Sequence, residues 1–324
     1  MAILIGIDEA GYGPLLGPMV VSAVAMELPD GLLRADLWQV LSKAVSAQKK
    51  GLTGRLLITD SKKAYSRTSG INTLRRSVLA SLSAWNNGHT PMTTAGDVLG
   101  IICPDLLDRI SIYPWYENMH THSLGHDVSD ISIAAGMLRK SLTENNSNIV
   151  SIRTKCLDVD LYNERVGRVK NKSRVLFTEL CSLIYEAFET DLTGSGPMQV
   201  VVDRQGGRVH YERELLRMFN GFSLSVIRQD PAMSSYELSR GSKTMRIHFC
   251  MKADAKYLLV SLASMVSKYV REIMMEALNA YFCHHCSDLK PTAGYWQDGQ
   301  RFVRDLAVHL PSHPHVPEKL VRIS

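Results

Sequence analysis

The segment from Ile5 to Pro18 reads Ile-Gly-Ile-Asp-Glu-Ala-Gly-Tyr-Gly-Pro-Leu-Leu-Gly-Pro. It begins as an apolar run that can pack in a sheet, and it continues directly into the adjacent carboxylates Asp8 and Glu9. The glycines that follow allow backbone conformations and close approaches that a side chain would block. The order predicts a β-strand that ends in two acids beside a glycine-rich turn, and this layout indicates a metal-dependent phosphodiester site.

Three further apolar runs are predicted to be strands, and two of them also lead into an acid. Residues 19–26 are apolar and β-branched and follow a Gly-Pro turn, so we expect them to pair with the first strand. The run at 197–203 ends at Asp203, and the run at 246–250 is followed closely by Asp254. Three separate strands are therefore expected to end at, or just before, carboxylates.

Helical periodicity separates these strands. Apolar residues recur at three- and four-residue steps from Leu258 to Tyr281, and a second apolar stripe lies at residues 174–188. This succession of strands and helices predicts an α/β domain. Residues 86–150 are less periodic and are expected to be an insertion, part of which folds, because loops of that length without structure are uncommon.

The acids Asp8, Glu9, Asp203 and Asp254 form a candidate metal site. Mg²⁺ and Mn²⁺ prefer oxygen ligands and are commonly held by carboxylates together with phosphate oxygens. Two such ions about 4 Å apart can activate a water and stabilise the leaving oxygen of a phosphodiester. Such chemistry needs several acids from separate elements, and these four come from three predicted strand ends.

Each acid also has a structural interpretation. Neighbouring residues on a strand point to opposite faces, so Asp8 and Glu9 can face one ion only if the strand ends between them. Asp203 could begin a turn, and Asp254 could be the N-cap of the helix that follows. Glu272, on that helix, is expected to be a solvated residue, with a role at the metal site as the alternative.

The chain resembles the type 2 ribonucleases H (RNase HII and HIII) in several motifs that occur in the family's order. These motifs are Asp8-Glu9-Ala10-Gly11, Asp60-Ser61-Lys62-Lys63, the strand-ending Asp203, Lys252-Ala253-Asp254, the helix pattern at 262–272 and, more weakly, Ala293-Gly294-Tyr295. The resemblance implies an RNase H-like α/β fold, with a mixed sheet flanked by helices. It also implies a catalytic domain at residues 1–257, which includes the insertion, and a C-terminal helical lobe at 258–324 over the substrate groove.

The activity that the resemblance implies is that of a metal-dependent endonuclease. Such an enzyme hydrolyses the RNA strand, or embedded ribonucleotides, of RNA–DNA hybrid duplexes and leaves 5′-phosphate and 3′-hydroxyl ends. Asp8, Glu9, Asp203 and Asp254 would be its catalytic residues and would hold Mg²⁺ or Mn²⁺, with a two-metal site expected.

The candidate substrate-binding residues also follow from the resemblance. Gly11, Tyr12 and Gly13 match a family turn that contacts the 2′-hydroxyl, the group that separates RNA from DNA. Lys62 and Lys63, next to Ser61, could contact phosphates through their charge, so Ser61 and Lys62 are taken as candidate substrate-binding residues. In the family, the tyrosine of the last motif packs at the ribose, and the resemblance implies that role for Tyr295. Tyr12 stands where the family has a basic residue, so a cation beside the scissile phosphate is lost and the chain is a divergent member. Two alternatives stay open: a non-catalytic nucleic-acid-binding relative, and a nuclease of the same fold with another DNA or RNA substrate.

A dense basic stretch lies at residues 165–174, Arg-Val-Gly-Arg-Val-Lys-Asn-Lys-Ser-Arg. It could bind along a nucleic-acid backbone, or it could be a solvent-exposed segment that leads into the helix at 174–188. The formal net charge of +5 and the pI near 8.8 fit a polyanionic partner without requiring one.

Composition places the chain among folded globular proteins, because 45% of its 324 residues are apolar and 21% are charged. It begins without a signal-peptide pattern, and no stretch has the roughly 18 consecutive apolar residues of a membrane span, so we expect a cytoplasmic protein without a membrane partner. Cys283 and Cys286 flank two histidines. A zinc site there would need His309, His313 or His315 as further ligands, and a helix end followed by a polar turn is the alternative.

Overall fold

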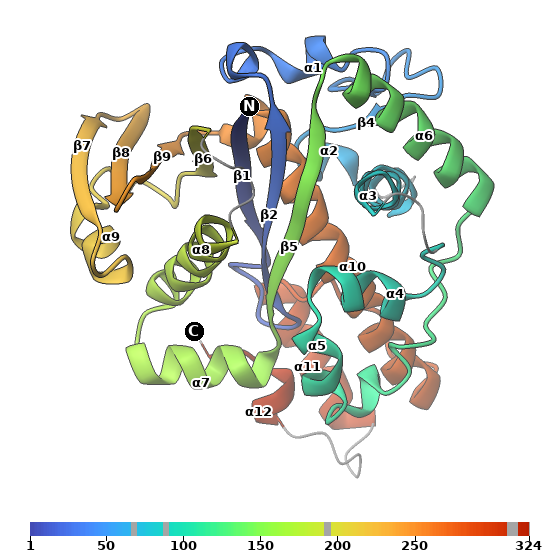
Figure 1. Cartoon of the computed structure of the whole chain (residues 1–324). Coiled ribbons are helices and arrows are strands. Elements are labelled where there is room, and N and C mark those ends of the chain that lie inside the picture. The colour runs from blue at the N-terminus through green and yellow to red at the C-terminus, as the bar shows by residue number, and fades with distance from the viewer. Residues whose placement is uncertain (66–69, 87–90, 191–195, 310–316, 324) are drawn as a thin grey trace.

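The structure, a computed structural model, describes residues 1–65, 70–86, 91–190, 196–309 and 317–323. A seven-stranded sheet of order β5-β2-β1-β6-β9-β8-β7 runs through the molecule (Figure 1). Its strands are β1 (Ala2–Ala10), β2 (Met19–Leu28), β5 (Asn148–Leu157), β6 (Met198–Asp203), β7 (Ser223–Gln229), β8 (Met233–Arg240) and β9 (Lys243–Cys250). Because β6 is parallel to β1 and β9 while the other pairs are antiparallel, the sheet is mixed. A short parallel pair, β3 (Val45–Ser46) and β4 (Leu56–Leu57), is separate from it.

Helices flank the sheet, with α8 on one face of its centre and α10 on the other (Figure 1). The α-helices are α1 (Leu37–Val40), α2 (Ser61–Ala64), α3 (Asn72–Trp85), α4 (Ala95–Ile102), α5 (Asp105–Ile110), α6 (Val128–Glu144), α7 (Val159–Val169), α8 (Lys172–Glu189), α9 (Glu212–Met218), α10 (Leu258–His285), α11 (Trp296–His309) and α12 (Pro317–Leu320). Three 3-10 turns are η1 (Asp30–Leu32), η2 (Pro114–Tyr116) and η3 (Ala253–Ala255). The predicted mixed sheet flanked by helices is confirmed, as are the four predicted strands and the two predicted helices.

The side chains of β1 alternate between two cores, as the two-residue period of a strand requires. Ile3, Ile5 and Ile7 belong to the core that contains α8, whereas Leu4 belongs to the core that contains α10. Gly6 faces α10, where an added Cβ would come within 2.2 Å of the Leu259 carbonyl carbon. The helix therefore lies directly against the strand's backbone, which fixes α10 beside the acids that follow in β1.

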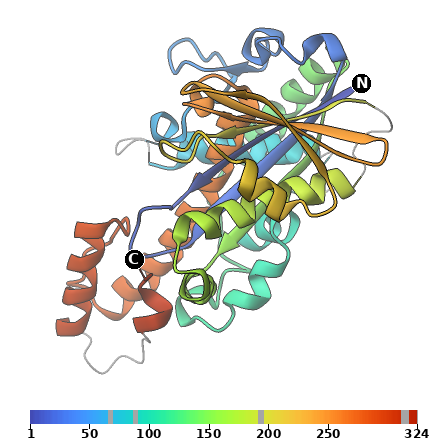
Figure 2. The same ribbon diagram turned by 90° about the vertical axis from the view of Figure 1, so that its left-hand side faces the viewer.

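The predicted insertion at residues 86–150 contains α4, α5, η2 and α6. Helix α6 packs against α3 and β5, and η2 packs against α10, where the rings of Trp115 and Phe282 lie 5.4 Å apart. The C-terminal helices, red in Figure 2, gather beyond one end of the sheet. The division of the chain at residue 257 stays a prediction, and α10 shares the core of β1 and β2. No helix in the described part of the chain is both long enough and apolar enough to cross a lipid bilayer.

Candidate active site

Strands β1, β6 and β9 run in the same direction, so their C-terminal ends meet at one edge of the sheet. The last β1–β6 pair is Ile7 with Val202, and β6 ends one residue later at Asp203. Asp8 and Glu9 therefore lie beyond the last β1–β6 pair, but both are still paired with β2. The strand continues to Ala10 and does not end between the two acids, so they occupy opposite faces at the same strand end.

Asp8 lies on the α10 side and is 8% exposed. Its main-chain oxygen accepts a hydrogen bond from Ser267 Oγ at 3.0 Å, and the Ser264 side chain lies close enough to lower the pKa of its carboxyl against the larger effect of burial. Both serines belong to α10, so the helix orients this acid. Glu9 is less buried and lies close enough to Tyr12 to affect the pKa of its phenol.

Asp203 and Asp254 are brought together by a long-range hydrogen bond. The main-chain N–H of Ala253 donates to Asp203 Oδ1 at 2.6 Å, which holds η3 and its residue Asp254 against the end of β6. The interpretation of Asp254 as the N-cap of α10 is wrong, because the cap residue is Tyr257 and no side chain caps that end. The interpretation of Asp203 as a local turn acid is not favoured either, since this partner lies 50 positions away.

The four carboxyls share an environment that disfavours their ionised forms. Burial raises the pKa of Asp8 well above its ordinary value, and Glu9 and Asp203 raise it further. Burial also raises the pKa of Glu9 to about 7, with Asp203 and Asp254 adding to the effect. Burial also raises the pKa of Asp203, and the charge of Asp254 adds to the effect. The pKa of Asp254 is raised in the same way by burial and by the charge of Asp60. The acids therefore lie near enough to repel one another, and a cation would relieve that repulsion.

The four acids do not form a preformed metal site. In the described ranges, no three His, Cys, Asp or Glu side chains come close enough to hold one ion between them. Oxygen donors on three elements suit Mg²⁺ or Mn²⁺, which also take water and phosphate oxygens as ligands.

The glycine turn after β1 is held by the C-terminal segment. Arg322 is buried, and its guanidinium donates to the main-chain oxygens of Gly11 at 2.5 Å and Tyr12 at 2.9 Å. Gly11 has φ +82°, and an added Cβ would lie 2.4 Å from the Pro18 oxygen, so the fold itself requires this glycine. At Gly13 an added Cβ would meet no atom within 4 Å, so that position is open.

Tyr295 lies beside the same turn. The Gly294 oxygen accepts hydrogen bonds from the main-chain N–H groups of Leu15 at 2.8 Å and Leu16 at 3.1 Å. Arg271, only 1% exposed, donates to the main-chain oxygens of Leu16 and Ala293. The Tyr295 side chain remains 52% exposed on this anchored loop.

The predicted Ser61 and Lys62 belong to α2, which also adjoins the acids. Ser61 is buried, and its hydroxyl accepts a hydrogen bond from Ser264 Oγ at 3.1 Å. Asp60 caps α2 through the Lys62 N–H at 2.9 Å. The charge of Lys62 opposes the effect of Asp60 on the pKa of Asp254, so the motif lies near the fourth acid.

Other predicted candidates lie apart from this cluster. Glu272 forms an ion pair with Lys268 at 2.5 Å and is only 18% exposed, so it is not the solvated residue that we expected. Helix α10 ends at His285, with Cys286 as its C-cap, which supports the helix-end interpretation. Of the further zinc ligands considered, His313 and His315 lie outside the described residues.

Two residues that sequence reasoning missed support the site: Ser264 and Arg322. Ser264 lies in the helix pattern that carried the resemblance, so its position, though not its contacts, had a signal. Arg322 had none, because it reaches a turn more than 300 positions away in sequence.

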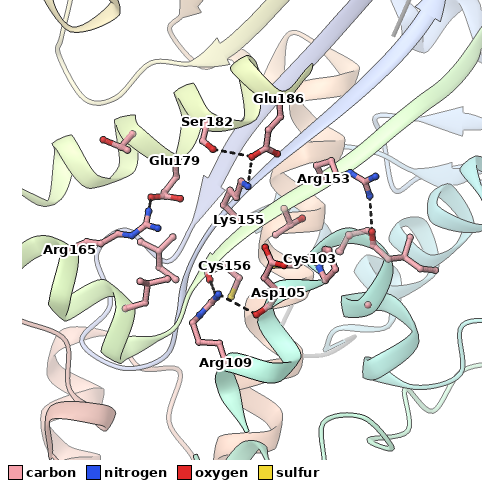
Figure 3. A pocket seen from close by; sticks show the side chains of 18 residues that line it. Cys103, Asp105, Arg109, Arg153, Lys155, Cys156, Arg165, Glu179, Ser182 and Glu186 are labelled. Carbon is pink, nitrogen blue, oxygen red and sulfur yellow. Dashed lines mark hydrogen bonds and ion pairs between the residues drawn. The ribbon is translucent and has the colours of Figure 1, made fainter. Parts of the chain in front are cut away.

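A cavity of about 820 Å³ lies along β5, between α4–α5 and α8 (Figure 3). None of the four acids lines it. Its basic side chains are largely neutralised, because Arg165 pairs with Glu179 and Lys155 pairs with Glu186. The chemistry therefore favours the carboxylate cluster over this cavity as the candidate active site.

Comparison with known proteins gives one curated relative and several solved structures. No protein-family model matches the chain. Ribonuclease HII of Burkholderia vietnamiensis is 34% identical over 114 residues, which are 33% of this chain and 50% of that protein. The match thus spans half the length of the relative.

The solved structures are more distant in sequence. RNase HII of Archaeoglobus fulgidus, solved in a complex with PCNA, is 19% identical with a TM-score of 0.46 over 99% of this chain and 94% of that one. Ribonuclease H2 of Pyrococcus horikoshii is 16% identical with a TM-score of 0.40 over 99% and 92% of the two chains. Bst-RNase HIII in complex with Mn²⁺ is 12% identical with a TM-score of 0.43 over 99% and 66%.

Proposed function

We propose that the chain is a divergent member of the type 2 ribonuclease H family and acts as a metal-dependent ribonuclease H. The proposed substrate is an RNA–DNA hybrid, or a duplex with embedded ribonucleotides, whose RNA phosphodiester bonds it hydrolyses to 5′-phosphate and 3′-hydroxyl ends. The observation that carries this proposal is the gathering of Asp8, Glu9, Asp203 and Asp254 at one end of β1, β6 and β9. The cytoplasmic location expected from the sequence stays a prediction.

The donor set fits Mg²⁺ or Mn²⁺, and these four acids are the residues that would hold such ions. Divalent ions supply Lewis-acid stabilisation of charge at the phosphoryl oxygens and a lowered pKa for bound water. The structure supports this fit through the mutual repulsion of the carboxyls, which an ion would remove. A site with two ions remains part of the proposal.

The chain's own residues orient the acids. Asp203 is fixed by the Ala253 N–H, and Asp8 is oriented by Ser264 and Ser267 of the buried helix α10. Such fixed contacts keep side chains in productive positions without reorganisation during the reaction. Glu9 lies on the opposite face of β1, at the same end of the strand.

Substrate selection is assigned to the glycine turn and its neighbours. The open position at Gly13 would let a ribose approach the backbone, where main-chain groups can sense a 2′-hydroxyl. The exposed ring of Tyr295 beside the turn would pack on the sugar, and Lys62 would contact a phosphate. The carbonyls of Gly11 and Tyr12 are already used by Arg322, so they hold the turn in shape.

The proposal is tested by incubating the protein with a hybrid duplex, a duplex with a single ribonucleotide, and an all-DNA duplex in Mg²⁺ or Mn²⁺. We expect cleavage of the RNA strand of the hybrid and none of the all-DNA duplex. Tight binding without cleavage would indicate the non-catalytic relative, and equal cleavage of the all-DNA duplex would indicate a nuclease with another substrate.

A further inference from the structure

A small basic groove lies between α8 and α9, outside the carboxylate cluster. It encloses about 210 Å³, and its charged lining consists of Arg174, Arg208, Arg213, Arg217 and the single acid Glu214. Arg174 lies in the first turn of α8, Arg208 follows β6, and the other two arginines lie on α9. We call these four arginines the arginine groove.

The positive charge of the arginine groove is largely uncompensated. Within the described ranges, Arg174, Arg213 and Arg217 form no ion pair with a carboxylate, and all three are exposed. Arg208 approaches Glu214 only to 3.8 Å. Beside β5, in contrast, Lys155 and Arg165 are paired with Glu186 and Glu179 (Figure 3). The groove is therefore the better site for an anion, because its arginines would not first have to leave a carboxylate.

One of the four arginines is fixed by aromatic rings. The Arg208 guanidinium lies 5.9 Å from the ring centre of Phe177 and 5.5 Å from that of Tyr211. Its Nη1 is buried, and in the described part of the chain no hydrogen-bond acceptor satisfies it. The two rings hold this guanidinium beside the three exposed arginines, so its charge adds to the attraction of the groove for phosphate oxygens.

Basic side chains near the arginine groove also approach the glycine turn of the candidate active site. Lys172 Nζ lies 5.3 Å from the ring centre of Tyr12, and the charge of Arg208 acts on the pKa of the Tyr12 phenol. In the sequence, Tyr12 is three residues after the acid Glu9, and Arg208 is five residues after the acid Asp203, so both belong to segments that leave the carboxylate cluster. A run of cations thus leads from the carboxylates along the start of α8 to α9.

On the premise of the ribonuclease function proposed above, we propose that the arginine groove binds the phosphodiester backbone of the duplex away from the scissile bond. The repeated charge of a nucleic-acid backbone matches a groove in which Arg174, Arg213 and Arg217 have no carboxylate partner among the described residues. Contacts to phosphate position a duplex without reading its bases or sugars. The groove should therefore strengthen binding to a hybrid and to an all-DNA duplex by the same factor.

The test compares the salt dependence of binding, in Mg²⁺, for variants in an Asp203→Asn background, which prevents cleavage during the measurement. The parent, an Arg213→Gln/Arg217→Gln variant and a Lys43→Gln/Arg246→Gln control are titrated with hybrid and all-DNA duplexes. The control removes two charges that already pair with Glu144 and Glu237. Each lost phosphate contact should lower the slope of log K against log salt by about 0.9.

We expect the slope of the groove variant to fall by about 1.8 on both duplexes. A rise in salt from about 50 to 200 mM would then weaken the parent about twelvefold more than the variant. An unchanged slope, an equal fall in the control, or an effect confined to one duplex would overturn the proposal. If the double variant does not fold, Arg174→Gln on the opposite wall should lower the slope by about 0.9, and an unchanged slope there would also overturn it.

Hybrid cleavage by the wild-type protein, measured in parallel, separates the two proposals. Absence of that cleavage would refute the ribonuclease function, and the salt slopes would still decide whether the groove binds a duplex. Cleavage together with unchanged slopes would refute the groove and leave the function standing.

Discussion

Replacing Glu9 with glutamine should stabilise the metal-free protein at alkaline pH, although it removes a proposed catalytic acid. Burial, with Asp203 nearby, raises the pKa of Glu9 to about 7 from its ordinary value of 4.5. Above pH 7 the folded protein must hold an ionised carboxyl that the unfolded chain ionises freely. This free-energy cost of the ionised Glu9 decreases as the pH falls from 7 toward 4.5, because the folded protein binds the proton before the unfolded chain does. Below pH 4.5 both states are protonated and the cost is absent.

The size of the effect follows from the difference between the two pKa values. Each pKa unit corresponds to about 1.4 kcal/mol, so the change from 4.5 to about 7 sets an upper limit of about 3.5 kcal/mol. Glu9 is partly exposed, and solvent screening lowers this figure. We expect Glu9→Gln to raise the free energy of unfolding by about 1–2 kcal/mol at pH 8.5 and by almost nothing near pH 4.5.

The assay is urea denaturation with a chelator at several pH values between 4.5 and 8.5. Glu144→Gln is a matched control, because Lys43 lowers the pKa of that exposed carboxyl and its loss should give no gain in stability. Excess Mn²⁺ should then favour the wild type, since an ion bound at a hundred times its Kd adds about 2.7 kcal/mol. A Glu9→Gln gain that is absent at pH 8.5, or that is equal at all pH values, would refute the reasoning.

Three further substitutions probe the substrate side and the fourth acid. Gly13→Ala should leave the melting temperature unchanged, because its Cβ meets open space, and should lower hybrid cleavage, whereas Gly11→Ala should lower the melting temperature because of its φ of +82°. Equal melting temperatures and full cleavage for both would contradict this difference. Tyr295→Ala should raise the KM for a hybrid several-fold without a stability change, since the ring is 52% exposed; an unchanged KM would exclude a contact with the ribose. Asp254→Asn should abolish cleavage and leave the melting temperature within about 2 °C, because this side chain does not cap α10. Loss of stability with retained activity per folded molecule would mean that its role is structural.

The sequence predicted the elements that local pattern controls. The apolar runs before Asp8 and Asp203 became β1 and β6, and the three- and four-residue period from Leu258 became α10. These predictions succeeded because side-chain alternation and helical periodicity are local properties of the chain. The same patterns predicted that three strands end at or near the acids, but not that β1, β6 and β9 are parallel neighbours, because strand pairing is not a local property.

Contacts between distant segments could not be predicted in this way. Nothing near Arg322 indicates that its guanidinium donates to the carbonyls of Gly11 and Tyr12. The bond from the Ala253 N–H to Asp203 likewise depends on how β6 and β9 end relative to each other. The role of Lys172 beside Tyr12 depends on the packing of α8 against the turn, which no local pattern encodes.

The most direct test of the account is single-turnover cleavage of a hybrid duplex by Asp203→Asn, with Asp105→Asn beside the β5 cavity as control. The asparagine oxygen can still accept the Ala253 N–H, so the fold should remain intact by circular dichroism and thermal melting. We predict a rate at least about a hundredfold below wild type, because one proposed negative ligand is lost, and a wild-type rate for the control. A folded Asp203→Asn protein that cleaves the hybrid at the wild-type rate would contradict the assignment of the carboxylate cluster as the active site.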